Sequence, residues 1–325
     1  MPNQTRLLRW GKLFIVIILC GLFSTQAVAA SFDCKKATTW VEKVVCSDPE
    51  LSKLDEELAK TYHDALTSLS PEGQRETKEY QRQWLKQLPG CPSDGCLEYS
   101  YKERIEQLQH SLIKFPDRIF RNVHVYYEKL DKTCPFGITV GDLTYPQIEN
   151  PRNENEKWWN DFISKQATDH FVEECVQSHD NYAVSFSNKH LISVERMNST
   201  FTEDAPAPRR AAAVSISLLL EDYRKLEASD LFDDETDWPH KIAALASQKL
   251  QEKKIAQELE LNRQTISSPE IMYKVTSPVE WVISRDGLGF GFHEFYLRGF
   301  SYFITIDWKT LDPYLSKTGH SLIYD

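Results

Sequence analysis

The stretch SFDCKKATTWVEKVVCSDPELSKLDEELAKTYHDALTSL (Ser31–Leu69) decides how the rest of the chain is interpreted. Ser47 followed by Glu50 is the pattern of a capping box, and Pro49 falls in the first turn, where its missing N–H costs nothing. Apolar residues then recur at steps of three and four, which is typical of one face of a helix. The stretch therefore predicts a long amphipathic helix, with an apolar stripe of Leu51, Leu54, Leu58, Tyr62, Ala65 and Leu69.

Two further helical segments follow the first one. The second begins near Ser70 and the third near Asp94, and a short helix over 37–45 precedes all three. Three apolar stripes can cover one another, so we expect a small antiparallel helical bundle. The expected core positions are Tyr80, Trp84 and Leu88 in the second segment and Leu97, Tyr101, Ile105, Leu108 and Leu112 in the third.

Four cysteines, Cys34, Cys46, Cys91 and Cys96, lie where these helices begin and end. We favour the local pairing Cys34–Cys46 and Cys91–Cys96, but four cysteines allow three pairings and the sequence does not choose between them. Each disulfide would add about 2–4 kcal/mol to a small core. The spacings are not those of a zinc site.

Two charged residues fall on the packed faces of the bundle. Asp55 lies on the first helix and Arg104 on the third. We expect an ion pair between them, because a charge on a packed helix usually has a partner. The alternative is that both contact a binding partner.

The first 29 residues have the features of a signal peptide. Arg6, Arg9 and Lys12 form a positive segment, 13–23 is an apolar run too short for a confident membrane span, and Ala27-Val28-Ala29 is a cleavage site. An uncleaved signal anchor is the alternative, and a lipoprotein at Cys20 is disfavoured by the bulky Leu19. No second apolar run of spanning length follows, so we expect a periplasmic or extracellular protein.

The chain is acidic. Its formal net charge is −10 and, because residues 1–29 contain three basic and no acidic residues, 35 Lys and Arg face 48 Asp and Glu in the remainder, a net charge of −13. This charge disfavours nucleic acid and suits a basic partner, although it would also serve solubility alone.

The helical stretch resembles a known family over about a quarter of the chain. The matching segments are Ser31–Ala37, Val41–Leu51, Leu54-Asp55, Tyr62, Gln81–Leu85, Tyr101 and Arg104–Leu108, together with all four cysteines in order. They resemble the N-terminal domain of the LprI-type lysozyme inhibitors. The resemblance implies an extracytoplasmic helical domain linked to inhibition of lysozyme, and it supplies no inhibitory residues.

The pattern changes from helical to alternating near Ile113–Arg118, where Pro116 ends the third helix. We therefore expect a helical domain over 31–115 and an α+β domain with an antiparallel sheet and packed helices over 119–325. Cys134 and Cys175 should form a third disulfide. The expected strands are 120–128, 138–148, 181–187, 190–201, 211–220, 279–284, 288–292 and 300–307, and the expected helices are 153–172, 236–262 and 309–315.

Two tryptophans stand together in the helix over 153–172. Paired tryptophans can stack on sugars, but Trp159, Phe162 and Ile163 follow helical spacing, so we favour a place in the core.

This second half also resembles a known module. The segments are Tyr145–Ile148, Tyr182–Val184, Leu191–Val194, Asp230–Phe232, Phe290–Phe295 and Ile304–Leu315. They resemble the α+β ectodomain of lysozyme-sensing anti-sigma factors. The loop Ala205–Arg210 has no histidine where members of that family carry an Ala-His dipeptide, and His293–Tyr296 stands where relatives have a Pro-Tyr-Glu-like sequence.

Catalytic motifs are missing from the sequence. His293-Glu294 lacks the second histidine of a zinc protease, because position 297 is Leu297. There is no nucleophile elbow, P-loop or dinucleotide fingerprint. Arg209-Arg210 either contacts an anionic glycan or is a loop tip. An acidic run could serve a glycosidase or bind Ca²⁺, but a solvated helix start fits better: Asp230, Asp233, Asp234, Glu235 and Asp237.

The sequence thus predicts an exported, disulfide-linked, two-domain envelope protein that is not an enzyme and has no cofactor or metal. The expected function is binding and inhibiting, or sensing, a lysozyme-type peptidoglycan hydrolase. One alternative is a non-catalytic envelope adaptor that binds peptidoglycan or another envelope protein. A further alternative is an accessory domain of a cell-wall enzyme that uses the acidic run.

Overall fold

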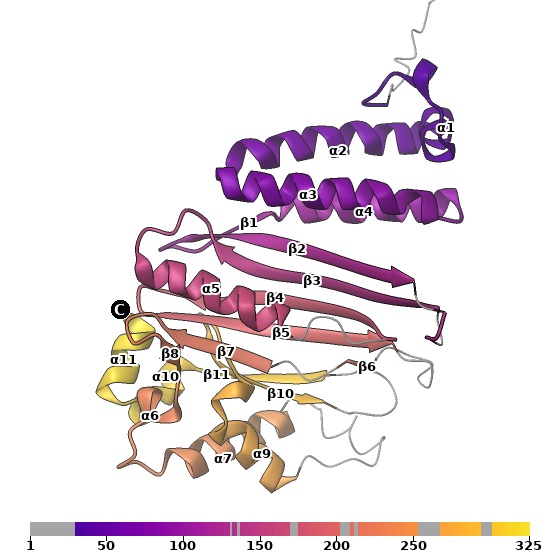
Figure 1. Ribbon diagram of the computed structural model, residues 1–325. Coiled ribbons are helices and arrows are strands. Elements are labelled where there is room, and N and C mark those ends of the chain that lie inside the picture. Colours follow the sequence, from indigo (N-terminus) through magenta and orange to yellow (C-terminus); the bar gives the residue numbers. More distant parts are fainter. Residues whose placement is uncertain are drawn as a thin grey trace, which may run out of the picture.

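The computed structural model describes residues 30–130, 132–134, 137–169, 175–201, 209–210, 214–252, 267–293 and 301–325. The expected signal peptide, 1–29, lies outside these residues. Among the described helices, none combines the length and the apolar character that crossing a membrane requires. The chain has an α+β fold, as predicted, with a helical part, a large sheet and a smaller sheet (Figure 1).

The helical part is the predicted bundle. Leu51 and Leu97 are fully buried in its core, and the Trp84 and Tyr101 rings meet edge to face at 5.2 Å. The α4 helix stops before Leu112, which instead begins a strand. The elements are η1 (Cys34–Lys36), α1 (Trp40–Ser47), α2 (Pro49–Ser68), α3 (Pro71–Gln87), η2 (Leu88–Gly90) and α4 (Asp94–Gln109).

The start of α2 differs from the predicted capping box. Asp48 is the N-cap, and its carboxylate accepts from the backbone N–H groups of Glu50 (2.8 Å) and Leu51 (3.1 Å). Ser47 is the last residue of α1, because α1 runs two residues further than the short helix that the sequence predicted. The positive end of the helix dipole also stabilises the negative charge of a carboxylate at this position.

All three disulfides that the sequence favoured are present. Cys34–Cys46 joins η1 to α1, and Cys91–Cys96 joins the end of η2 to the first turn of α4. Cys134–Cys175 links residues that are 41 positions apart. Disulfides of this kind are typical of proteins exported from the reducing cytosol.

The large sheet has the order β1-β2-β3-β4-β5-β7-β8, with β6 beside β5. Its pairs are antiparallel except for β3 and β4, which run parallel from Val140↔Gln177 to Thr144↔Asn181. The helix α5 (Glu154–Thr168) lies within the connection between these two strands, as a parallel pair requires. The strands are β1 (Leu112–Lys114), β2 (Ile119–Leu130), β3 (Ile138–Ile148), β4 (Gln177–Ser187), β5 (Leu191–Phe201), β6 (Arg209–Arg210), β7 (Val214–Leu219) and β8 (Arg224–Lys225).

The α5 helix packs on this sheet through the residues that the sequence assigned to the core. Trp159 and Ile163 have no exposed surface, and the Trp159 ring meets Phe120 at 5.4 Å. Trp158 is partly buried and meets Tyr223 edge to face at 5.2 Å. The tryptophan pair therefore serves packing.

A smaller sheet, ordered β11-β10-β9, forms the other core with the C-terminal helices. The Phe232 ring stacks on Trp238 at 4.5 Å, and Trp281 meets both rings edge to face. The helices α9 and α11 were not predicted. The elements are α6 (Ala228–Leu231), α7 (Trp238–Glu252), α9 (Ser268–Thr276), η3 (Pro278–Glu280), β9 (Trp281–Ile283), β10 (Gly287–His293), β11 (Ser301–Asp307), α10 (Trp308–Leu311), η4 (Asp312–Tyr314) and α11 (Lys317–Tyr324).

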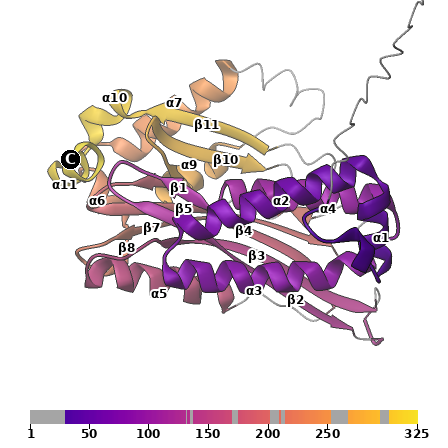
Figure 2. The same cartoon turned by 90° about the horizontal axis from the view of Figure 1, so that it is seen from above.

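The helical part lies against the large sheet, with α3 beside β2 (Figures 1 and 2). Arg121 of β2 is buried at this contact. Its Nε donates to Glu76 of α3 at 2.9 Å and its Nη1 donates to Glu149 at 3.2 Å. Glu149 also accepts from the backbone N–H of Ser70, at the start of α3. Arg121, near the start of β2, therefore joins α3 to Glu149, which directly follows β3.

Candidate functional site

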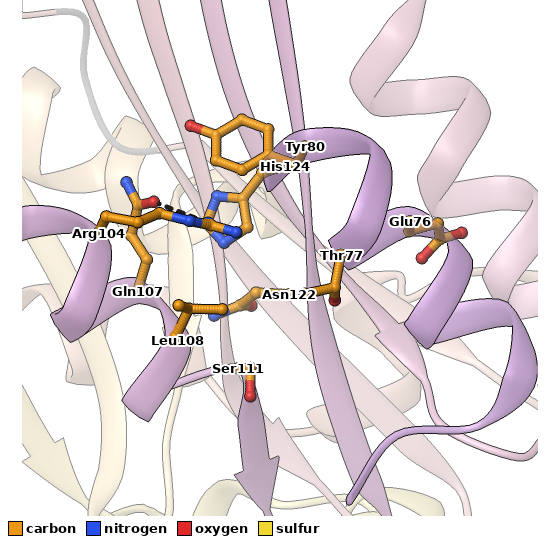
Figure 3. Close-up of a pocket in the computed structure, with 9 residues that line it drawn as sticks. All are labelled: Glu76, Thr77, Tyr80, Arg104, Gln107, Leu108, Ser111, Asn122 and His124. Atoms are coloured by element: carbon orange, nitrogen blue, oxygen red, sulfur yellow. Dashed lines mark hydrogen bonds between the residues drawn. The ribbon is translucent and has the colours of Figure 1, made fainter. Parts of the chain in front are cut away.

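Two adjoining cavities lie where α3 and α4 meet β2 and β3. They share Tyr80, Arg104 and Gln107. The inner cavity has a volume of about 10 Å³ and reaches Asn122 and His124 of β2 (Figure 3). The outer cavity has a volume of about 120 Å³, which is room for several water molecules at about 30 Å³ each.

Regular spacing brings these side chains together. Arg104 and Gln107 are three residues apart on α4, so they share one helix face. Asn122 and His124 are two residues apart on β2, so they share one sheet face. Tyr80 of α3 lies over this face, with its ring 5.0 Å from the His124 ring.

Arg104 is the most unusual residue of the site. Its side chain is 2% exposed, its Nε donates to Gln81 Oε1 at 2.8 Å, and its Nη1 donates to Gln107 Oε1 at 3.2 Å. Its guanidinium carbon lies 4.6 Å from the centre of the Tyr80 ring, and Nη2 is buried without a hydrogen-bond partner. Burial lowers the pKa of Arg104 to about 10, which still leaves the side chain charged at neutral pH.

The predicted ion pair between Asp55 and Arg104 is wrong. Asp55 accepts instead from the backbone N–H of Ser31 at 2.6 Å and from the Tyr101 hydroxyl at 3.2 Å. Arg104 faces the sheet, away from this pair of donors, and no described carboxylate lies within ion-pair distance of it. A buried charge without a counter-charge is costly, so it points to a compensating group.

His124 contributes no charge at neutral pH. Burial, and then the nearby Arg104, lower the pKa of its imidazole to about 4. Its Nδ1 lies 2.9 Å from the Thr144 hydroxyl. Burial likewise raises the pKa of the Tyr80 phenol. Arg104 therefore lies at the inner end without a carboxylate partner, whereas Glu76, which also lines the inner cavity, is paired with Arg121.

The outer cavity carries charge of the opposite sign. Glu103 of α4 and Asp142 of β3 both line it. Glu103 is exposed, but its surroundings partly desolvate its carboxyl, and this desolvation, followed by the Asp142 carboxylate, raises the pKa of Glu103. A hydrogen bond to Asp142 raises the pKa of His179, whose Nδ1 lies 3.6 Å from the Asp142 carboxylate. The two cavities thus share Arg104, whose charge has no carboxylate partner among the described residues, and two carboxylates, Glu103 and Asp142, line the outer one.

The acidic run noted in the sequence does not converge on a site. Arg224 donates two hydrogen bonds of 2.7 Å to the Asp230 carboxylate, and these bonds lower the pKa of Asp230. Asp233 accepts from the backbone N–H of Glu235, and Asp237 lies 2.6 Å from His240. No cluster of three or more His, Cys, Asp or Glu suited to a metal occurs among the described residues.

The remaining predicted residues lie elsewhere. Of the six paired cysteines, Cys91 borders the outer cavity. The backbone of Arg209-Arg210 pairs with β5, and His293 ends β10. Glu294 and Ala205–Pro208 lie outside the described residues.

The sequence did not predict the two cavities, because their walls come from four separate elements, α3, α4, β2 and β3. One signal was available in the sequence. Arg104 stands at a position that was expected to be packed, and neither Ser100 nor Leu108, four positions away, is acidic and could pair with it. Which helix face would meet β2 could not be read from periodicity.

Comparisons with known proteins leave the family open. No protein-family model matches the chain, and no curated protein matches it. A DUF3298 family member from Bacteroides fragilis shows 13% identity and a TM-score of 0.42, covering 61% of this chain and 94% of its own. A DUF3298 family protein from Pseudomonas aeruginosa shows 10% identity and a TM-score of 0.44, covering 62% and 96%.

Proposed function

We propose that this chain is an exported envelope protein that binds and inhibits, or senses, a lysozyme-type peptidoglycan hydrolase, and that it is not itself an enzyme. The observation that carries the proposal is in the helical part. The four cysteines on which the resemblance to LprI-type inhibitors depends form two disulfides there, and its apolar positions form one core.

The negative net charge of the chain is suited to a positively charged partner. The chain without residues 1–29 has a net charge of −13, and charge of opposite sign accelerates the encounter of two proteins. The absence of catalytic motifs from the sequence also favours binding over catalysis.

An inhibition assay tests this proposal. The purified, oxidised chain without residues 1–29 is added to lysozymes of several classes, and hydrolysis of cell-wall suspensions is followed. We expect inhibition of at least one class. Removing the Cys34–Cys46 disulfide with two Ser substitutions should weaken it, because that disulfide holds η1 on α1.

The matched control removes the Cys134–Cys175 disulfide, which lies in the sheet part of the molecule. Inhibition by this variant should persist if the helical part makes the contact. If the folded protein inhibits no lysozyme class, the proposal fails. Circular dichroism establishes that each variant is folded.

A second function is favoured by the cavity beside Arg104. A non-catalytic envelope adaptor that binds peptidoglycan would need a polar site of this kind, with both charges available. A pull-down with purified cell-wall sacculi tests it. Retention on sacculi without any effect on lysozyme would favour the adaptor over the inhibitor.

A further inference from the structure

The cavity between α3, α4 and the sheet has opposite charges at its two ends. At the inner end, Nη2 of Arg104 is buried and has no partner. At the outer end, Glu103 and Asp142 face the same space. At the outer end His179, 3.6 Å from Asp142, meets part of the charge of the two carboxylates, whereas Arg104 has no carboxylate partner among the described residues.

We propose that this cavity binds a small zwitterion, an amino acid with a short side chain, with its carboxylate on Arg104 and its ammonium group facing Glu103 and Asp142. This site is separate from the proposed interaction with lysozyme, and it would be present whether or not the chain inhibits that enzyme.

The carboxylate end follows from the hydrogen bonds of Arg104. Nε is held by Gln81, whereas Nη1 is held by the longer bond to Gln107 (3.2 Å) and Nη2 is free. Gln107 is only partly buried and lines both cavities, so its amide can move aside. A carboxylate that replaces this amide oxygen would accept from Nη1 and Nη2 together, in the two-pronged geometry that guanidinium groups favour.

The ammonium end follows from the repulsion between two carboxylates. Both carboxylates line the outer cavity, and Asp142, after the larger effect of desolvation, raises the pKa of Glu103, while His179 beside Asp142 offsets part of this repulsion. An ammonium group between them would relieve this repulsion. A simple anion would have to pass these carboxylates, and a simple amine would leave Arg104 uncompensated, so a ligand with both charges fits best.

The size of the cavity limits the ligand. A volume of about 120 Å³ accommodates a compound of a few non-hydrogen atoms. Tyr80, Trp84 and Tyr126 supply aromatic wall surface for a short apolar side chain. Glycine and alanine are therefore the probes of choice.

Isothermal titration calorimetry on the oxidised chain without residues 1–29 tests the proposal directly. Glycine and alanine are compared with their two halves, acetate and methylamine, at constant pH and ionic strength. We expect saturable binding of at least one amino acid, and affinities about tenfold or more lower for the halves, because each lacks one charged contact. No binding of either amino acid, or equal binding of acetate, would overturn the proposal.

Two variants on α4 locate the ligand. Glu103→Gln should weaken amino-acid binding about tenfold, whereas Glu106→Gln, an exposed position on the same helix, should leave it unchanged. Both sites are exposed, so folding is not at risk. Equal affinity in the two variants would refute the ammonium end of the model.

Arg104→Gln tests the carboxylate end and should abolish binding. Because a buried residue is changed, Gln107→Ala serves as the second variant. It removes the competing amide oxygen, so amino-acid affinity should be retained or increased. A loss of affinity in Gln107→Ala would show that the carboxylate is not held at Nη1 and Nη2.

Discussion

Among the residues whose burial the structure describes, three arginines are almost fully buried, and they differ in which groups compensate their charge. Arg118 pairs with Glu156, and Arg121 pairs with Glu149 and Glu76. Arg104 has amide oxygens and an aromatic ring instead of a carboxylate. Two of these arginines therefore hold elements together, and the third leaves unused binding capacity next to a cavity.

The neighbour of Arg104 on the sheet gives a prediction about pH. Burial lowers the pKa of His124 from 6.5 to about 4, so between these values the unfolded chain binds a proton that the folded chain does not. The free energy of unfolding should therefore decrease as the pH falls from 6.5 to 4, by up to about 3 kcal/mol from this residue. Above pH 6.5 the imidazole is neutral in both states and contributes no slope.

Urea denaturation of wild type and of His124→Gln, at several pH values, measures this effect. The variant should lose less stability between pH 6.5 and pH 4 than the wild type does. Parallel pH dependences of the two proteins would mean that His124 takes up its proton equally well in the folded state.

At the scale of helices and strands, the sequence predicted most of what local pattern can define. The stripes of α2, α3 and α4 were recognised, and the bounds of β3 were predicted as found. The parallel pairing of β3 with β4 and the short strand β1 were missed, since both depend on contacts between distant segments. The cavity was missed for the same reason, because helix spacing does not tell which face meets β2.

A close approach of two elements depends on a glycine in α11. A Cβ on Gly319 would lie 2.0 Å from the carbonyl oxygen of Leu231, in α6. Gly319→Ala should therefore destabilise the protein by about 1–3 kcal/mol through overpacking. Gly95 is the matched control, because a Cβ there meets no atom within 4 Å and the residue lies in the first turn of α4.

Thermal unfolding measures the stability of Gly319→Ala and Gly95→Ala relative to the wild type. Gly95→Ala should be neutral or up to about 1 kcal/mol more stable, since alanine reduces the freedom of the unfolded chain. A Gly319→Ala variant as stable as Gly95→Ala would show that α11 can move away from α6 without cost.

The disulfides should differ in how much each stabilises the fold. Cys134–Cys175 closes a separation of 41 residues, and Cys91–Cys96 closes a separation of five. If loop entropy dominates, replacing the first pair by alanine should cost about 4 kcal/mol and replacing the second about 2 kcal/mol. Chemical denaturation of the two double variants measures the difference. Equal losses would contradict the entropic account.

At the scale of the whole molecule, the helical core and the sheet cores are joined along one line of contact. The α3 helix lies along β2 (Figure 2). Arg121 of β2 is buried at this contact and donates to both Glu76 and Glu149. Because these residues belong to different parts of the chain, their ion pairs couple the unfolding of the helical part to that of the sheet.

Replacing Arg121 by leucine should therefore affect the whole molecule. It leaves Glu149, which is 8% exposed, without its cation, and breaking a buried pair in this way costs about 3–5 kcal/mol. We expect urea unfolding of Arg121→Leu to begin at lower concentration and to separate into two steps, with loss of helical circular dichroism first. Arg82→Leu is the control, because Arg82 and Glu79 form an exposed pair that contributes at most about 1 kcal/mol.

Adding Glu149→Gln to Arg121→Leu decides whether the lost stability comes from the uncompensated charge. The double variant should recover part of the loss, because no buried carboxylate then remains unpaired. If the double variant is less stable than Arg121→Leu alone, the contact depends on the packing of the two side chains, and the helical part is joined to the sheet by shape and not by charge.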